Sequence, residues 1–238
     1  MLKKSSFFVL LLGALISNDL SVAKTLVAQD EFCLGCHPAV AKSKHVLLHL
    51  GCEKCHMIPE GERHPMNAAS IKLVQDVPFL CFKCHPETDF KGKYVHSPVA
   101  MGRCEACHDL HRSYDQKPLR DESEVCFRCH GKENFTKKYN HKVAAGSCGK
   151  RCHNSHVSDY PHLLSSDVNT LCIGCHKEQQ SGAHIVAFAG GTLHPVTGVY
   201  NQNNLNMEMN CTSCHNPHSS DYTKLFAVRT KCHNCHKY

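Results

Sequence analysis

The sequence predicts a fold with little regular secondary structure, in which short helices and loops are set by covalent links rather than by an apolar core. The chain has 238 residues with 18 Cys and 21 His, but no Trp, 10 Phe and 7 Tyr. An ordinary domain of this length buries a continuous aliphatic and aromatic core. The cysteines instead recur in close pairs, each followed by a histidine. We therefore expect short helical turns, almost no sheet, and an architecture built from repeats of this motif.

Nine such motifs use every cysteine of the chain. The pairs are Cys33 and Cys36, Cys52 and Cys55, Cys81 and Cys84, Cys104 and Cys107, Cys126 and Cys129, Cys148 and Cys152, Cys172 and Cys175, Cys211 and Cys214, and Cys232 and Cys235. The histidines that follow them are His37, His56, His85, His108, His130, His153, His176, His215 and His236. Eight motifs read Cys-x-x-Cys-His, and the sixth carries one extra residue between its cysteines.

Cys-x-x-Cys-His is the attachment signature of c-type haem, in which two thioethers hold the porphyrin and the adjacent His binds the iron. Zinc sites and disulfide frameworks also use cysteine pairs, but neither requires a His directly after the second Cys. Nine chance placements of His out of nine have a probability of about 10⁻⁹ at this composition. The sequence thus predicts nine covalent haems and a chain of short helices and loops wrapped around them.

The haem motifs fall into repeats at about 33–65, 80–117, 125–162 and 171–225, with a single motif at 232–236. Each repeat has a first motif, a lone His followed by Gly, and a second motif with a trailing His. The variant motif, Cys148 to His153, occupies a second-motif position between His141 and His156. We expect Gly149 to absorb its extra residue. A disulfide between Cys148 and Cys152 would instead leave the third repeat with one haem.

Twelve histidines remain after the proximal ones, which exceeds the nine distal ligands that bis-His coordination requires. Repeat placement favours eight of them as distal iron ligands: His45, His64, His96, His111, His141, His156, His194 and His218. The ninth is one of His162, His184 and His49, between which the sequence does not choose, and His233 is the expected spare.

The trailing histidines His111, His156 and His218 follow a proximal His by three residues, about one helical turn away on the same face. The distal side of their own haem lies across the porphyrin plane and out of reach. We therefore expect each to bind the iron of a neighbouring haem, most simply the partner haem of its own repeat.

The N-terminus has the layout of a secretory signal peptide. Lys3 and Lys4 precede an apolar run from Phe7 to Ile16, and Ser21-Val22-Ala23 forms a small-x-small site. A membrane anchor is the alternative, but a span needs about 20 apolar residues. We expect residues 1–23 to be removed, a haem domain at 24–238 without a transmembrane segment, and a periplasmic location, with outer-membrane association or secretion as alternatives.

The charge of the chain points away from nucleic acid once haem is counted. The chain carries +6, of which residues 1–23 contribute +1, so residues 24–238 carry +5. Each ferric bis-His haem with two ionised propionates adds −1, which brings nine haems and the chain to about −4. No nucleotide loop, nucleophile elbow or zinc-protease motif is found in the sequence.

Residues 33–225 resemble multihaem cytochromes c of the doubled Cys-x-x-Cys-His type, in the segments CEACHDLH, CGKRCHNSH and CTSCHNPH. The stretch CEKCHMIPEGERH is similar to repeats in the decahaem cytochromes of porin–cytochrome conduits. The resemblance implies electron transfer in anaerobic or extracellular respiration, with quinol-linked cytochromes and an outer-membrane porin complex as partners. A His at each of the two axial positions of every iron would give low potentials and leave no open position for catalysis. A reductase with one open haem and an extracellular filament subunit are the alternatives.

Overall fold

The computed structural model describes residues 31–42, 45, 51–111, 122–144, 148–181, 184, 196, 198, 200–201 and 204–229. The chain divides into two compact units. The first comprises Met1–Cys81 and His108–Pro118, and the second comprises Phe82–Cys107 and Leu119–Tyr238. The expected signal peptide at 1–23 lies outside the described residues.

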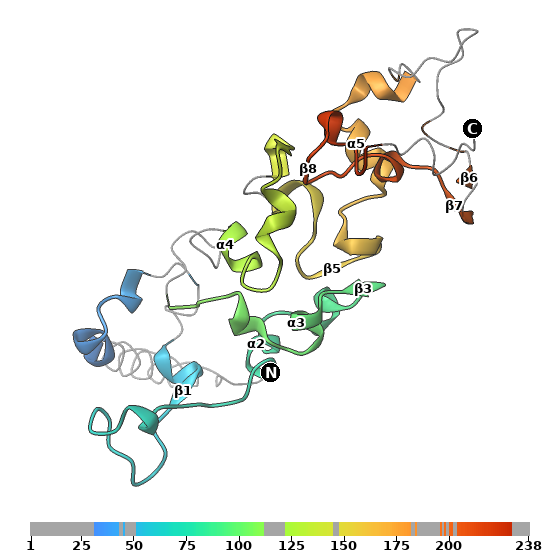
Figure 1. The fold of residues 1–238 in the computed structure, drawn as a ribbon. Helices are drawn as coiled ribbons and strands as arrows, with labels where there is room; N and C mark the ends of the chain where they lie inside the picture. Colours follow the sequence, from blue (N-terminus) through green and yellow to red (C-terminus); the bar gives the residue numbers. More distant parts are fainter. Residues whose placement is uncertain are drawn as a thin grey trace, which may run out of the picture. The chain divides into compact units, whose positions relative to one another are not determined.

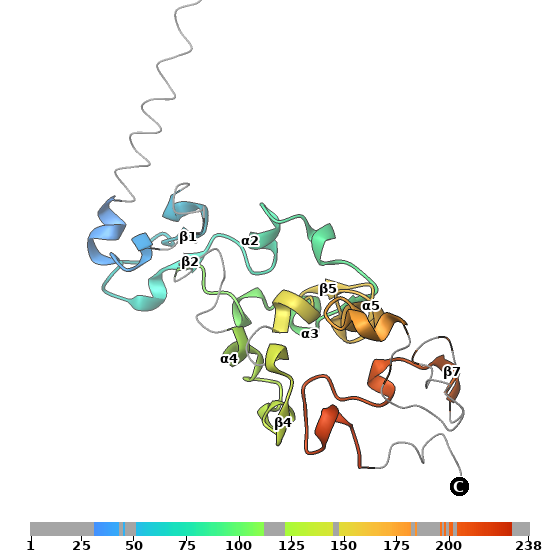
Figure 2. The same ribbon diagram turned by 90° about the horizontal axis from the view of Figure 1, so that it is seen from above.

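The helices of the described residues are short, as Figures 1 and 2 show. The α-helices are α2 (Phe79–Phe82), α3 (Ser97–Ala100), α4 (Glu122–Cys126) and α5 (Val168–Ile173), and residues 31–36 are also helical. The 3₁₀-helices are η1 (Val40–Lys42), η3 (Cys52–Lys54), η4 (Ala68–Ser70), η5 (Glu87–Phe90), η6 (Cys104–Ala106), η7 (Lys132–Phe135), η8 (Lys142–Ala144), η10 (Pro161–Leu163), η11 (Lys177–Ser181), η12 (Cys211–Ser213) and η13 (Thr223–Leu225). One π-helix, η9, spans Cys148–Cys152.

The strands form antiparallel pairs of two strands each. They are β1 (His56–Met57) with β2 (Lys72–Leu73), β3 (Tyr94–Val95) with β5 (Val157–Ser158), β4 (Tyr139–Asn140) with β8 (Ser219–Ser220), and β6 (Tyr200–Asn201) with β7 (Asn204–Glu208). Two of these pairs join segments about sixty to eighty residues apart, since Val95 pairs with Val157 and Asn140 with Ser219. The expectation of short helices and little sheet is confirmed.

Apolar side chains form no buried core among the described residues. The side chains that are buried there are those of three serines, Ser70, Ser219 and Ser220. Large apolar residues such as Phe32 and Met66 are 84% exposed. The described fold is therefore held by local turns and strand pairs rather than by a packed apolar interior. No helix in the described ranges combines the length and apolar character needed to cross a bilayer.

Candidate haem-binding sites

Four of the described Cys-x-x-Cys-His motifs share one backbone arrangement, a helical turn that ends at the histidine. The His N–H donates to the carbonyl of the first Cys in four described motifs: His37 to Cys33 at 2.9 Å, His130 to Cys126 at 2.9 Å, His176 to Cys172 at 3.0 Å and His215 to Cys211 at 3.0 Å. This bond closes an α-type turn and fixes the direction in which the proximal His leaves the backbone.

The variant motif keeps the same bond despite its extra residue. Cys148–Cys152 form the π-helix η9, and the His153 N–H donates to the Cys148 carbonyl at 3.0 Å. A π-turn spans one residue more than an α-turn, so the insertion widens the turn and leaves its two ends joined as in the other motifs. Cys148 and Cys152 are both free thiols in the structure.

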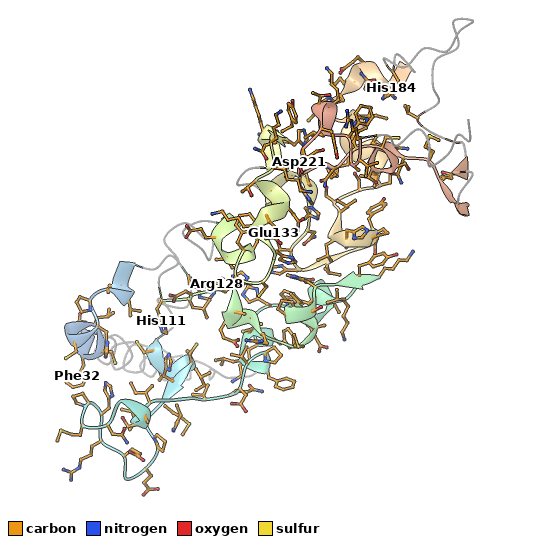
Figure 3. The ribbon with its side chains drawn as sticks, in the orientation of Figure 1. Phe32, His111, Arg128, Glu133, His184 and Asp221 are labelled. Carbon is orange, nitrogen blue, oxygen red and sulfur yellow. The ribbon has the colours of Figure 1, made fainter. Side chains whose placement is uncertain are left out.

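Six proximal histidines lie opposite a second imidazole that follows no cysteine pair. The pairs and their ring-centroid separations are His37–His64 at 6.0 Å, His56–His111 at 5.7 Å, His130–His96 at 6.1 Å, His153–His218 at 6.1 Å, His176–His141 at 6.2 Å and His215–His184 at 6.1 Å. Figure 3 labels His111 and His184, one from each compact unit. The ring planes are 20° to 31° apart in five pairs, and 62° apart in His215–His184.

This spacing fits a haem iron held between two imidazoles. A metal–nitrogen bond is about 2.0 Å long, and the ring centroid lies about 1 Å behind the nitrogen, so trans imidazoles on one iron have centroids about 6 Å apart. Each pair, with the adjacent cysteine pair, could therefore hold one covalent haem.

Backbone carbonyls fix the orientation of several of these rings. Nδ1 lies 3.0 Å from the Ser155 carbonyl in His96, and 3.0 Å from the Pro217 carbonyl in His141. A carbonyl only accepts hydrogen bonds, so Nδ1 must carry the proton and donate it. The lone pair then resides on Nε2, which is the nitrogen that can bind iron.

The proximal His153 and His215 are oriented in the same way by two equivalent loops. Their Nδ1 atoms lie 2.9 Å from the His162 carbonyl and 2.7 Å from the Lys224 carbonyl. In each loop two successive residues adopt left-handed backbone, with φ of 58° and 56° at His162 and Leu163. Left-handed backbone is unfavourable for residues other than glycine. Here it turns the loop carbonyl toward the imidazole.

These loops show that the variant motif has the surroundings of a standard one. The Asn154 N–H donates to the Leu163 carbonyl at 2.7 Å, and Asn216 donates to the Leu225 carbonyl at 2.7 Å. The Ser165 N–H likewise bonds the Cys152 carbonyl at 2.9 Å. Its counterpart, Ala227 N–H, bonds the Cys214 carbonyl at 2.9 Å. The extra residue is thus confined to the π-turn.

The loops that orient His153 and His215 share a sequence pattern that the motif spacing does not reveal. The segments SDYPHLL (158–164) and SDYTKLF (220–226) share the pattern Ser-Asp-Tyr-x-x-Leu, and both form the carbonyl-bearing loops. Ser158 and Ser220 each donate to a carbonyl across the loop, from Leu164 and Phe226 respectively.

A second such pattern is the Asp or Asn directly after a proximal His. Asp109 Oδ1 accepts from the His111 N–H at 3.1 Å, and Asn154 Oδ1 accepts from the His156 N–H at 3.2 Å. Asn216 makes the same bond to His218 at 3.0 Å. Each forms an Asx-type turn that directs the trailing His away from its own motif.

Burial favours the neutral form, which binds metals, in three of these imidazoles. Burial lowers the pKa of His56, and the nearby His111 lowers it further. Burial also lowers the pKa of His218, with smaller effects from His153 and His141. The same holds for His156, where burial acts first and His96 second. Metal-binding imidazoles must be deprotonated at the coordinating nitrogen, so these environments suit ligands.

The trailing histidines pair differently from the simplest expectation. His218 faces His153 of the preceding repeat and not His176, the first motif of its own repeat. His111 similarly faces His56 of the preceding repeat and not His85. The expectation named the partner haem of the same repeat, whereas these two trailing histidines lie opposite proximal histidines of the preceding repeat. For His218 the reason is that the segment after the Asx turn pairs with strand β4 of the preceding repeat.

The lone histidines face the first motif of the following repeat. His96 faces His130, and His141 faces His176. The two remaining pairs are local, since His64 faces His37 within the first repeat and His184 faces His215 within the fourth. Of the two described candidates for the ninth ligand, His162 and His184, His184 is the one whose ring lies opposite a proximal His.

The other candidates have different settings. The imidazole of His162 is exposed, and its backbone carbonyl is what contacts His153. His156 lies against Phe90, with ring centroids 5.5 Å apart. His45 is half-buried, and the distal partners of His85 and His108 stay predictions. The residues His49, His194, Cys232, Cys235 and His236 lie outside the described residues.

Cysteines of successive motifs lie close together in the second compact unit. Burial and then the nearby Cys129 raise the pKa of Cys107, and burial and then Cys175 raise that of Cys152. A hydrogen bond with Cys211 raises the pKa of Cys172, and Asn169 Oδ1 accepts from the Cys211 N–H at 3.1 Å. The points of haem attachment therefore follow one another at close range along this unit.

Comparison with known proteins identifies the motif. The family model described as the doubled CXXCH motif matches residues 96–135 and 140–181. Each matched segment begins at or next to a lone His and extends past the proximal His that it faces, His130 in one and His176 in the other. A search of curated proteins finds no match to this chain. The match supports covalent attachment of c-type haem through these motifs, and it identifies the chain as similar to multihaem c-type cytochromes that transfer electrons.

Proposed function

We propose that this protein is an electron carrier with nine covalently bound, bis-His c-type haems of low potential. One observation carries the proposal: six proximal histidines each face a second imidazole at 5.7–6.2 Å, the spacing that a shared iron requires. The remaining three motifs have the same sequence pattern. The bound haem supplies reversible one-electron exchange between ferric and ferrous iron.

The residues of the chain determine what that chemistry can do. Two imidazoles fill both axial positions, which favours electron transfer over substrate binding and favours a low potential over that of a His/Met pair. Carbonyl bonds to Nδ1 of His96, His141, His153 and His215 make these ligands more basic, which stabilises the ferric state further. The close succession of attachment cysteines supports transfer between neighbouring haems.

We further propose that residues 1–23 direct export and that the protein works in the periplasm in anaerobic or extracellular respiration. The apolar segment and the Ser21-Val22-Ala23 site support export. Quinol-linked cytochromes would be the donors, and an outer-membrane porin–cytochrome complex would be an acceptor. The decahaem-like stretch CEKCHMIPEGERH supports this setting.

Spectroscopy of the purified holo-protein tests the proposal. Electron paramagnetic resonance of the ferric protein should show low-spin iron alone, and the reduced protein should bind little CO, because no axial position is open. A redox titration should place all potentials well below that of a His/Met haem. A stoichiometric high-spin haem that binds CO and reduces nitrite would instead establish the reductase alternative.

A further inference from the structure

Two distal candidates that serve different haems are hydrogen-bonded to each other. The His141 N–H donates to the His218 carbonyl at 3.0 Å, and His141 Nδ1 donates to the carbonyl of the preceding Pro217. The side chains nevertheless face different proximal histidines, since His141 faces His176 and His218 faces His153. Two neighbouring sites thus share one piece of backbone.

The shared backbone is the strand pair β4–β8, which leads directly into both ligands. Asn140 pairs with Ser219 immediately before His141 and after His218. The pair β3–β5 repeats this arrangement, because the His96 N–H donates to the His156 carbonyl at 2.9 Å and Val95 pairs with Val157. Because the arrangement occurs in both strand pairs, it is a property of the repeat and not of one loop.

Ser219 anchors β8 to the segment that precedes β4. Its side chain is fully buried, and the Oγ donates to the Asn134 carbonyl at 2.7 Å and accepts from the Lys137 N–H at 3.3 Å. Between these two contacts lies Phe135, whose ring centroid is 4.5 Å from that of His218. Both residues that Ser219 bonds lie in or near η7, which Figure 3 marks with Glu133.

The equivalent position in the other strand pair holds a larger residue, and its neighbour is correspondingly smaller. Val157 stands where β8 has Ser219, and Gly92 stands where the β4 segment has Lys137. A Cβ placed on Gly92 would lie 2.3 Å from Val157 Cγ2, which real structures do not tolerate. Glycine is therefore required at position 92 because it lies next to the Val157 side chain, and a residue with a Cβ, such as Lys137, requires a small side chain at 219.

We propose that the β4–β8 pair is a common holder for the distal ligands of two haems, those attached at Cys148–Cys152 and Cys172–Cys175, and that Ser219 is its positioning residue. This inference rests on the bis-His ligation proposed above. A side chain too large for position 219 would push β8 away from β4 and displace both His218 and His141. One substitution far from either iron thereby alters two sites.

The test compares Ser219→Val with the double variant Ser219→Val/Lys137→Gly in the full-length holo-protein. The single variant should lose the low-spin signal of two irons, measured by electron paramagnetic resonance and by CO bound per haem. The double variant recreates the Gly92/Val157 combination and should regain the parental spectrum. The reciprocal substitution Gly92→Lys should perturb the ligand His96, and Gly92→Lys/Val157→Ser should restore it.

The outcomes separate this inference from the proposed function. A parent protein without uniform low-spin haem would remove the function proposal itself. With a low-spin parent, loss of one iron's signal or of none in Ser219→Val would overturn the common holder. If Ser219→Val fails to accumulate, the double variant decides alone, because a double variant that is not fully low-spin contradicts the packing argument.

Discussion

Removal of His218 tests most sharply which distal His serves which haem, because the proposed pairing assigns His218 to a haem outside its own repeat. The ring centroid of His218 lies 6.1 Å from that of His153 and 4.5 Å from that of Phe135. His218→Ala should therefore leave one iron with His153 as its only axial imidazole. With nine motifs in the chain, we expect one ninth of the iron to become high-spin and one equivalent of CO to bind after reduction.

The identity of the opened haem follows from combining His218→Ala with loss of a single haem. In a Cys148→Ala/Cys152→Ala background, the haem beside His153 cannot attach, and His218→Ala should add no high-spin signal. In a Cys172→Ala/Cys175→Ala background, the extra high-spin iron should persist. The two backgrounds are matched, since each lacks one haem from the same part of the chain. The reverse result, with the signal lost only in the second background, would refute the assignment of His218 to the haem beside His153.

Three further predictions use the same preparations. His184→Ala should open the haem attached at Cys211–Cys214, whereas His162→Ala should leave every haem low-spin, because only the backbone carbonyl of His162 contacts a proximal ligand; CO titration distinguishes the two. Deleting Arg151 should convert the π-turn of η9 into an ordinary turn and keep the haem, which intact mass would show; loss of one haem would mean that the wider turn is needed. Asp167 caps α5 by accepting from the Thr170 N–H at 3.0 Å, and hydrogen bonds to Thr170 lower its pKa. The stability that comes from its ionised form should be present above the ordinary Asp pKa and lost as pH falls through the lowered one, and Asp167→Ala should remove this contribution to amide protection in α5.

The sequence predicted the parts of the fold that follow from local chemistry. The spacing of the cysteines and the small number of aromatic residues indicated short turns without a core. In the described residues α5 is six residues long and each sheet has two strands. The π-turn at Cys148–Cys152 was foreseen only as an insertion that Gly149 could absorb. Local spacing was sufficient because the hydrogen bond that closes the turn lies within the motif itself, as in Cys126–His130 and Cys148–His153.

The ligand partners could not be predicted in the same way, because they depend on contacts between repeats. His141 and His218 are 77 positions apart, and only the register of β4 with β8 places them together. Geometry along one helical turn predicted that His218 would not bind the iron of its own haem, but it could not predict which other proximal His lies opposite it. The choice of His184 over His162 likewise required the loop in which the His162 carbonyl meets His153.

The covalent haem count tests the central claim most directly. The intact mass of the denatured holo-protein should equal residues 24–238 plus nine haems, one for each motif, including Cys148–Cys152. A mass with eight haems and a disulfide between Cys148 and Cys152 would contradict the equivalence of the variant motif. A mass without haem would contradict the account as a whole.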